Sequence, residues 1–181
     1  MEKSNLTKEL LAESFRDLLL HRDFEKITIK HITDRAGVIR PTFYYHFQDK
    51  YDVLEYILKR DVIDPASRMI AEDGLNSAAV TQIFSAFDND RLFYQKAFKV
   101  TGQNGFFEIL FLNFKKECET AFKAEGRSAP VNSEMAAMYY AIGLAHVIRF
   151  WIESGKKAMS LEEICTLYEF LITHSIYDFM K

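Results

Sequence analysis

The side chains best suited to chemistry lie close together in the stretch ITIKHITDRAGVIRPTFYYHFQDK, which begins at Ile27. Arg40 carries a planar guanidinium that can donate two parallel hydrogen bonds to the major-groove edge of guanine. Tyr44 and Tyr45 can offer their hydroxyls to phosphate or their ring edges to a thymine methyl group. Two adjacent tyrosines on one helix cannot both face a core, so at least one should be exposed. The chemistry of this stretch is that of DNA recognition.

Two short helices separated by a turn are predicted to position these side chains. Ile29, Ile32 and Ala36 fall on one face of the first helix, and Thr28 precedes it as an N-cap residue. Gly37 has no Cβ, so it can take the left-handed conformation that ends a helix and turns the chain sharply. Two helices joined in this way form a helix-turn-helix.

The second helix is expected over Arg40 to Phe47. Phe43 and Phe47 are four residues apart and face the core, whereas Pro41 lies in the first turn, where its missing N–H costs nothing. Ile39 stands just before the helix and has no side-chain oxygen to cap it. The first-turn amides are then capped by backbone or water, or left free for phosphate, and the sequence does not decide between these alternatives.

The order A-G-V-x-R-x-T-F-Y-x-H-F-x-D-K resembles the N-terminal domain of the TetR family of transcriptional regulators. The resemblance runs from about Leu6 to Val62 and departs from the family at Ile39, where many members carry Ser or Thr. Pattern and resemblance together assign mainly to DNA phosphates the side chains of Thr28, Thr42, Tyr44, His46 and Lys50. They assign to base edges the side chains of Arg40, Pro41, Thr42 and Tyr45. The competing interpretation is a helical hairpin whose aromatic rings only pack.

The size and composition of the chain favour an all-α fold in two parts. It has 181 residues, of which 49% are hydrophobic, and its 7 Gly and 3 Pro are too few to punctuate a sheet-rich fold. We predict an N-terminal three-helix DNA-binding domain over residues 1–48 and a C-terminal helical bundle over 49–181 for ligand binding and dimerisation. A helix over 49–63, capped by Asp49, links the two parts and ends at Asp64-Pro65.

Further helices are expected where apolar residues recur at intervals of three and four. A first helix over 5–21 has an apolar stripe that begins at Leu6 and Leu10, and the body helices are predicted over 77–87, 90–100, 103–124, 133–154 and 160–180. Ser160 and Glu163 have the spacing of a capping box. The last two helices are apolar over more than one face, and in the TetR family they carry dimerisation. A homodimer through this helix pair is therefore expected.

An effector pocket is expected among the many aromatic residues of the body. A bundle rich in large rings packs imperfectly, which makes a cavity plausible, and the resemblance implies that a small-molecule effector binds there. The candidate lining residues are Phe107, Phe111, Tyr139, Gly143 and His146. Ordinary core packing is the alternative for each phenylalanine, and a place in solvent or at an interface is the alternative for His146.

Several other functions lack support in the sequence. It contains no G-x-S-x-G, no H-E-x-x-H and no glycine-rich phosphate loop, so neither an enzyme nor a cofactor is expected. Cys118 and Cys165 lack metal-ligand spacing, so no metal site is predicted and both thiols are expected to be reduced. There is no uninterrupted apolar run of about eighteen residues and no signal core, so a cytoplasmic protein without membrane contact is expected.

Charge is spread unevenly along the chain. Residues 1–60 carry eleven Lys and Arg against ten Asp and Glu, so this part has a charge of +1 and the rest has −4, for a net charge of −3. A nearly neutral DNA-binding part should rely on a few placed contacts that dimer symmetry doubles. The predicted function is a ligand-responsive repressor that binds a near-palindromic operator on double-stranded DNA. The alternative is a helical small-molecule binding or sequestration protein without a DNA function.

Overall fold

The computed structural model describes residues 2–74, 76–102, 104–124, 132–155, 159–175 and 178. Most of these residues are helical and none of them forms a strand, which confirms the predicted all-α class. The first elements are α1 (Glu2–His21), the 3₁₀ turn η1 (Phe24–Lys26), α2 (Ile29–Ala36), α3 (Arg40–His46), α4 (Lys50–Leu58), the π-helical turn η2 (Lys59–Ile63) and α5 (Asp64–Asp73). The remaining elements are α6 (Ser77–Asn89), α7 (Arg91–Ala97), α8 (Phe106–Ala124), α9 (Ser133–Ser154) and α10 (Leu161–Thr173).

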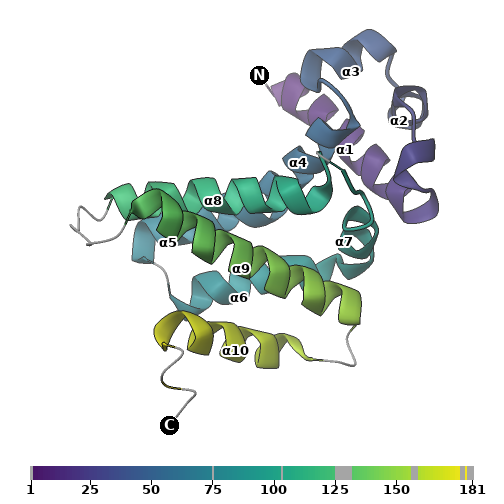
Figure 1. Cartoon of the computed structure of the whole chain (residues 1–181). Coiled ribbons are helices and arrows are strands. Elements are labelled where there is room, and N and C mark those ends of the chain that lie inside the picture. The colour runs from purple at the N-terminus through teal and green to yellow at the C-terminus, as the bar shows by residue number, and fades with distance from the viewer. Residues whose placement is uncertain are drawn as a thin grey trace.

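The helices are arranged in two parts that share one core. Figure 1 shows α1, α2 and α3 together at one end and α10 at the other, with α8 and α9 side by side between them. We call residues 1–48 the head and the following residues the body. A continuous cluster of buried apolar side chains runs from α1 to α10 through both parts. The division at residue 48 therefore stays a prediction, because no gap in the core marks it.

The head closes around one face of α1. Leu11 and Phe15 are fully buried there together with Phe43 of α3. Leu6 and Leu10, which the periodicity placed in the same stripe, are exposed instead. The buried face of α1 is centred on Leu11 and Phe15. Leu10 directly precedes Leu11, so its side chain points about 100° away from that face around the helix axis.

The helix that links head and body does not end at Asp64-Pro65, so that prediction was wrong. α4 continues through η2 into α5, which ends at Gly74. Proline lacks an N–H and its ring crowds the preceding helical turn. Here that turn is the wider π form, in which the Asp64 amide donates to the Lys59 carbonyl, and the wider spacing accommodates the ring.

Aromatic rings fill the interior of the body. Phe84 meets Trp151 edge to face at 5.6 Å between ring centroids, and Phe87 meets Tyr94 at 4.5 Å. All four rings are buried. α9 spans the predicted range, and α10 begins with the predicted capping box at Ser160. The other helices differ from prediction by a few residues at their ends. The predicted helix 160–180 was too long, because α10 ends at Thr173 and His174 is extended; residues 176–177 and 179–180 of that prediction lie outside the described residues.

Candidate nucleic-acid interface

A tight turn joins α2 and α3. The Thr28 hydroxyl accepts from the His31 amide at 3.2 Å, and the Thr28 amide donates to His31 Nδ1 at 3.3 Å, so the two residues cap α2 reciprocally. Gly37 ends α2 at φ 68°, the predicted left-handed conformation. Val38 packs against the core from within the turn. The predicted helix-turn-helix is therefore present.

α3 has one buried face and one open face. Phe43 is fully buried and anchors the helix to α1 and α2. On the open side, Tyr45 is 77% exposed and Tyr44 is 53% exposed. Arg40 and Pro41 are exposed beside them. Packing within the chain therefore does not account for the exposure of either tyrosine, which leaves their ring edges and hydroxyls available to a partner.

The polar groups of α3 are only lightly held. The Arg40 guanidinium donates to the Tyr44 hydroxyl one turn later at 3.5 Å, a long hydrogen bond that leaves it free to reach a base edge. Thr42 and His46 are half-buried at the flanks of the helix. Burial and the charge of Lys8 lower the pKa of His46, so this imidazole is neutral near pH 7.

The start of α3 has no side-chain cap. Ile39 occupies the N-cap position in an extended conformation, makes no side-chain hydrogen bond and is 69% exposed. Its carbonyl accepts from the Thr42 amide at 2.9 Å. The backbone therefore pairs the Thr42 amide, which is one of the alternatives that the sequence left open, and Pro41 has no N–H to cap.

Lys50 has an internal role that the sequence did not indicate. It was expected to contact phosphate, but its Nζ donates to the carbonyls of Phe24 at 2.7 Å and Ile27 at 3.2 Å. The ammonium also lies 4.1 Å from the centroid of the Phe24 ring. Desolvation lowers its pKa. An ammonium has three N–H donors, so two hold the η1 segment against α4 and one is left for a phosphate.

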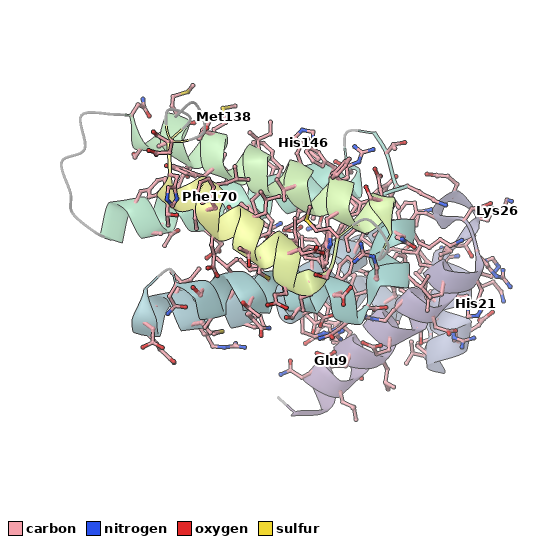
Figure 2. All side chains as sticks on the ribbon, turned by 90° about the horizontal axis from the view of Figure 1, so that it is seen from below. Glu9, His21, Lys26, Met138, His146 and Phe170 are labelled. Atoms are coloured by element: carbon pink, nitrogen blue, oxygen red, sulfur yellow. The ribbon has the colours of Figure 1, made fainter. Side chains whose placement is uncertain are left out.

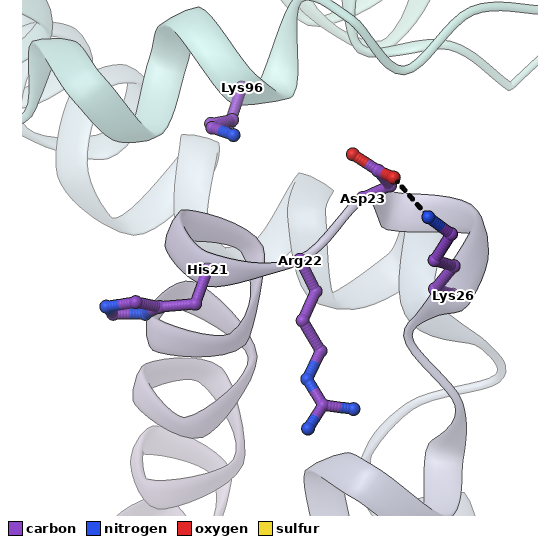
Figure 3. A pocket seen from close by; sticks show the side chains of 5 residues that line it. All are labelled: His21, Arg22, Asp23, Lys26 and Lys96. Carbon is purple, nitrogen blue, oxygen red and sulfur yellow. Dashed lines mark hydrogen bonds and ion pairs between the residues drawn. The ribbon is translucent and has the colours of Figure 1, made fainter.

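Two surface clefts stand out, and both lie beside the C-terminal end of α1 rather than on α3. The larger has a volume of about 330 Å³ and is lined by His21, Arg22, Asp23, Lys26 and Lys96. Lys26 turns to Asp23, with 2.8 Å between Nζ and Oδ2, while Arg22 and His21 point away from Lys96 (Figure 3). These cations do not converge, so the cleft is not a formed anion site.

Family comparisons assign both parts of the chain. A family model described as "Bacterial regulatory proteins, tetR family" matches residues 13–57, which include the whole helix-turn-helix. A second model, "Transcriptional regulator C-terminal region", matches residues 77–173, which is more than half of the chain. The chain belongs to the TetR family of transcriptional regulators. This confirms the resemblance found in the stretch from Ala36 to Lys50.

Individual members of the TetR family show how far the likeness extends. The HTH-type dhaKLM operon transcriptional activator DhaS of Lactococcus lactis is 30% identical over 112 residues, which span 62% of this chain and 58% of DhaS. The uncharacterised HTH-type regulator YxbF of Bacillus subtilis is 36% identical over 62 residues, 32% of this chain and 16% of YxbF. The aligned part is thus less than two thirds of either relative.

Solved structures share the fold at low sequence identity. A putative TetR-family regulator from Syntrophomonas wolfei superposes with a TM-score of 0.65 at 16% identity and covers 95% of this chain and 97% of its own. The DhaS structure gives 0.63 at 18% identity, covering 92% and 94%. NalD, the secondary repressor of the MexAB-OprM efflux pump of Pseudomonas aeruginosa, gives 0.60 at 15% identity, covering 91% and 92%.

The structure places three of the five candidate effector residues on the surface and two of them half-buried. Tyr139, Gly143 and His146 lie on the exposed face of α9, so they do not line an internal cavity of the chain. Figure 2 shows His146 pointing outward from this helix, as does Met138. Phe107 and Phe111 are half-buried on α8, and the Phe107 ring lies 4.6 Å from the His146 ring. A TetR-type effector site built on these residues stays a prediction. Helix periodicity identifies an apolar face of α9, but it does not show whether other helices cover that face.

Sequence reasoning missed several residues near the interface. His31 completes the cap of α2, and its spacing three residues after Thr28 was the available signal, although Glu or Gln is the usual residue there. Lys8 of α1 lies 4.2 Å from the centroid of the Tyr56 ring and affects His46. No local pattern pointed to Lys8, because its position depends on how α1 crosses α4.

Metal-binding groups and membrane-spanning helices are two other features that the described residues could contain. No group of three or more His, Cys, Asp or Glu there is placed to hold a metal ion. By length and apolar composition, α9 is the one helix of this part that could cross a membrane. It packs along α8 and belongs to the region matched by the regulator model, and the core helix of a soluble protein meets the same criterion.

Proposed function

We propose that the chain is a DNA-binding transcriptional regulator that acts in the cytoplasm and reads operator DNA through α3. The observation that carries this proposal is the open face of α3, where Arg40, Pro41, Tyr44 and Tyr45 are exposed over the buried Phe43. A rigid recognition helix enters the major groove, with its N-terminal residues at the base edges. Arg40 stands in the first position of the helix, where a bidentate contact to guanine is available.

We further propose that the protein works as a homodimer through α9 and α10. α9 exposes a row of apolar side chains with helical spacing, namely Met135, Tyr139, Ile142 and Phe150. α10 adds Leu167, Phe170 and Leu171. A four-helix bundle formed with a second copy would cover both faces. Two-fold symmetry would then present two heads to a near-palindromic operator and double the few contacts that a nearly neutral head can make.

Binding to DNA selected from a random library at low salt tests the proposal. The wild type should select a site with two related half-sites and lose affinity steeply as salt rises. Arg40→Ala should cost about 1–3 kcal/mol of binding free energy and relax the preference at one base pair in each half-site. Arg22→Ala is the matched control, because Arg22 is an exposed arginine of the head that lies outside α3.

Three outcomes decide between the interpretations. A loss confined to Arg40→Ala, with altered base preference, supports base reading by α3. Equal losses at all sequences from both variants would overturn the role given to Arg40. No binding to any fragment at low salt would instead favour the helical small-molecule binding or sequestration protein.

The sign of regulation is proposed as effector-relieved repression, with activation as the second candidate. NalD is named a repressor, whereas DhaS, the relative with 30% identity, is named an activator. A reporter placed behind the selected operator separates the two, because deleting the regulator raises expression under repression and lowers it under activation. An effector must bind one head arrangement better than the other to change either output.

A further inference from the structure

The contact between head and body is organised around one arginine. Arg16 lies on α1, and its guanidinium donates to Asp61 of the π-helical turn η2 and to Asp90 between α6 and α7. The guanidinium also covers the Phe93 ring at 4.8 Å from its centroid. The Arg16 side chain is only 16% exposed. One side chain thus joins the head, the linking helix and the body.

The same turn of the linking helix makes a second set of contacts with α1. Arg60 pairs with Glu13 at 2.8 Å, with Glu9, and with its neighbour Asp61 at 2.6 Å. The Tyr56 hydroxyl donates to Glu9 as well. These contacts join α1 to the linking helix, whereas Arg16 is the residue that carries the network on to Asp90 and hence to α7.

The geometry of these contacts is directional, unlike the apolar contacts around them. Burial of apolar surface has no preferred angle, so the shared core allows the head to tilt while it stays attached. Charge-assisted hydrogen bonds between a planar guanidinium and carboxylates have preferred angles and distances. Arg16 therefore restrains the angle between head and body, whereas the hydrophobic core mainly keeps the two parts in contact.

Two further features distinguish this junction. π-helical turns occur often at functional sites, and η2 interrupts the linking helix next to the ion pairs. The Tyr94 hydroxyl of α7 is buried there without a hydrogen-bond partner. Burial and the nearby charge of Asp61 raise the pKa of Tyr94. The Tyr94 hydroxyl is thus able to donate a hydrogen bond to the Asp61 carboxylate if Arg16 releases that carboxylate.

We propose that Arg16 is a positioning residue whose bond to Asp90 sets the angle of the head and thereby the half-site spacing that the dimer accepts. Without the Arg16 cation, Asp61 would keep its pair with Arg60, but Asp90 would lose its bond to α1 and with it the directional link between head and body. This inference rests on the proposed function, because it requires two heads on one operator. It assigns to Arg16 a role in specificity although the residue is far from α3 in sequence.

The test is a series of operators whose half-sites are separated by the selected spacing or by one base pair more or less. The wild type should bind the altered spacings at least about tenfold more weakly, because both heads must fit one helical phase. Asp90→Asn and Arg16→Gln should each reduce this discrimination to below about threefold, and the double variant should show no further change. Lys115→Gln is the control, because it removes a paired cation within the body.

Asp90→Asn keeps the test decisive even if Arg16→Gln does not fold, because Arg16 then retains Asp61 and Glu13. Full spacing discrimination in Asp90→Asn would overturn the inference and leave the proposed function intact. A wild type that binds operators as a monomer, with no spacing preference, would overturn both. Lost discrimination in the Arg16 and Asp90 variants, with the Lys115 control unchanged, would support the inference.

Discussion

Lys50→Ala should destabilise the head through contacts that have no connection with DNA. The Lys50 ammonium donates to the carbonyls of Phe24 and Ile27 at 2.7 and 3.2 Å, and it lies over the Phe24 ring. Removing the ammonium leaves both carbonyls without this donor and removes the link between the η1 segment and the start of α4. The variant therefore tests whether Lys50 is a structural tether as well as a phosphate contact.

The size of the effect follows from the contacts. A hydrogen bond from a charged donor contributes about 1.5–3 kcal/mol, and an exposed cation–π contact about 0.5–1 kcal/mol. Lys50 is only half-buried, so water replaces part of both hydrogen bonds. Its removal also relieves an unfavourable positive charge at the N-terminus of α4, worth about 0.3–1 kcal/mol. We expect a net loss of about 2 kcal/mol in the free energy of unfolding.

Urea denaturation followed by far-UV circular dichroism measures this loss. With an m-value of about 2.5 kcal/mol per molar urea for a chain of this size, the midpoint should fall by about 0.8 M. Protein concentration must be held fixed, since the proposed dimerisation would stabilise the folded state. The control is Lys30→Ala, which removes an exposed lysine paired with Asp34 on α2 and should cost less than about 0.5 kcal/mol.

Equal midpoints for the Lys50 and Lys30 variants would refute the tether. In DNA binding, Lys50→Ala should flatten the salt slope by about one ion, because the third N–H is available for a phosphate. An unchanged salt slope together with the loss of stability would show that Lys50 stabilises the head and makes no phosphate contact.

Three further predictions follow from single side chains. Tyr94→Phe should raise the free energy of unfolding by about 1 kcal/mol, because its buried hydroxyl has no partner; a decrease would reveal a partner such as a bound water. Ile39→Thr should stabilise the protein by about 1 kcal/mol by supplying the missing cap of α3, seen as a higher melting temperature, and an unchanged value would contradict this. Phe150→Asp should weaken the dimer by at least about tenfold in sedimentation velocity, since Phe150 is 71% exposed on the proposed interface; an unaffected dimer would place the interface elsewhere.

Much of the head could be predicted because its signals are local. Thr28 and Gly37 mark the two ends of α2 through cap and turn chemistry, and both ends are observed. The spacing of Phe43 and Phe47 set the buried side of α3, and both are buried. Since neighbouring residues determine caps and helix faces, the sequence was enough to place the exposed residues Arg40, Tyr44 and Tyr45.

The sequence was less informative where one pattern has more than one structural outcome. Tyr139 and His146 were candidate pocket residues, with a place in solvent or at an interface as the alternative for His146. Both are exposed on α9, and periodicity alone does not show which face of a helix its neighbours cover. Pro65 was expected to end the linking helix, but a π-helical turn absorbed it. Helix propensity alone does not show whether a proline ends a helix or is accommodated by a π-helical turn.

The sequence by itself determined the helical class, the helix-turn-helix and the residues that α3 exposes, since each depends on contacts within a few residues along the chain. Only the tertiary structure showed that Lys50 bonds back to η1 and that Arg16 joins Asp61 to Asp90. Asp61 and Asp90 lie 45 and 74 residues from Arg16 in sequence, so no local pattern could pair them. The helices had to pack before these charges could meet.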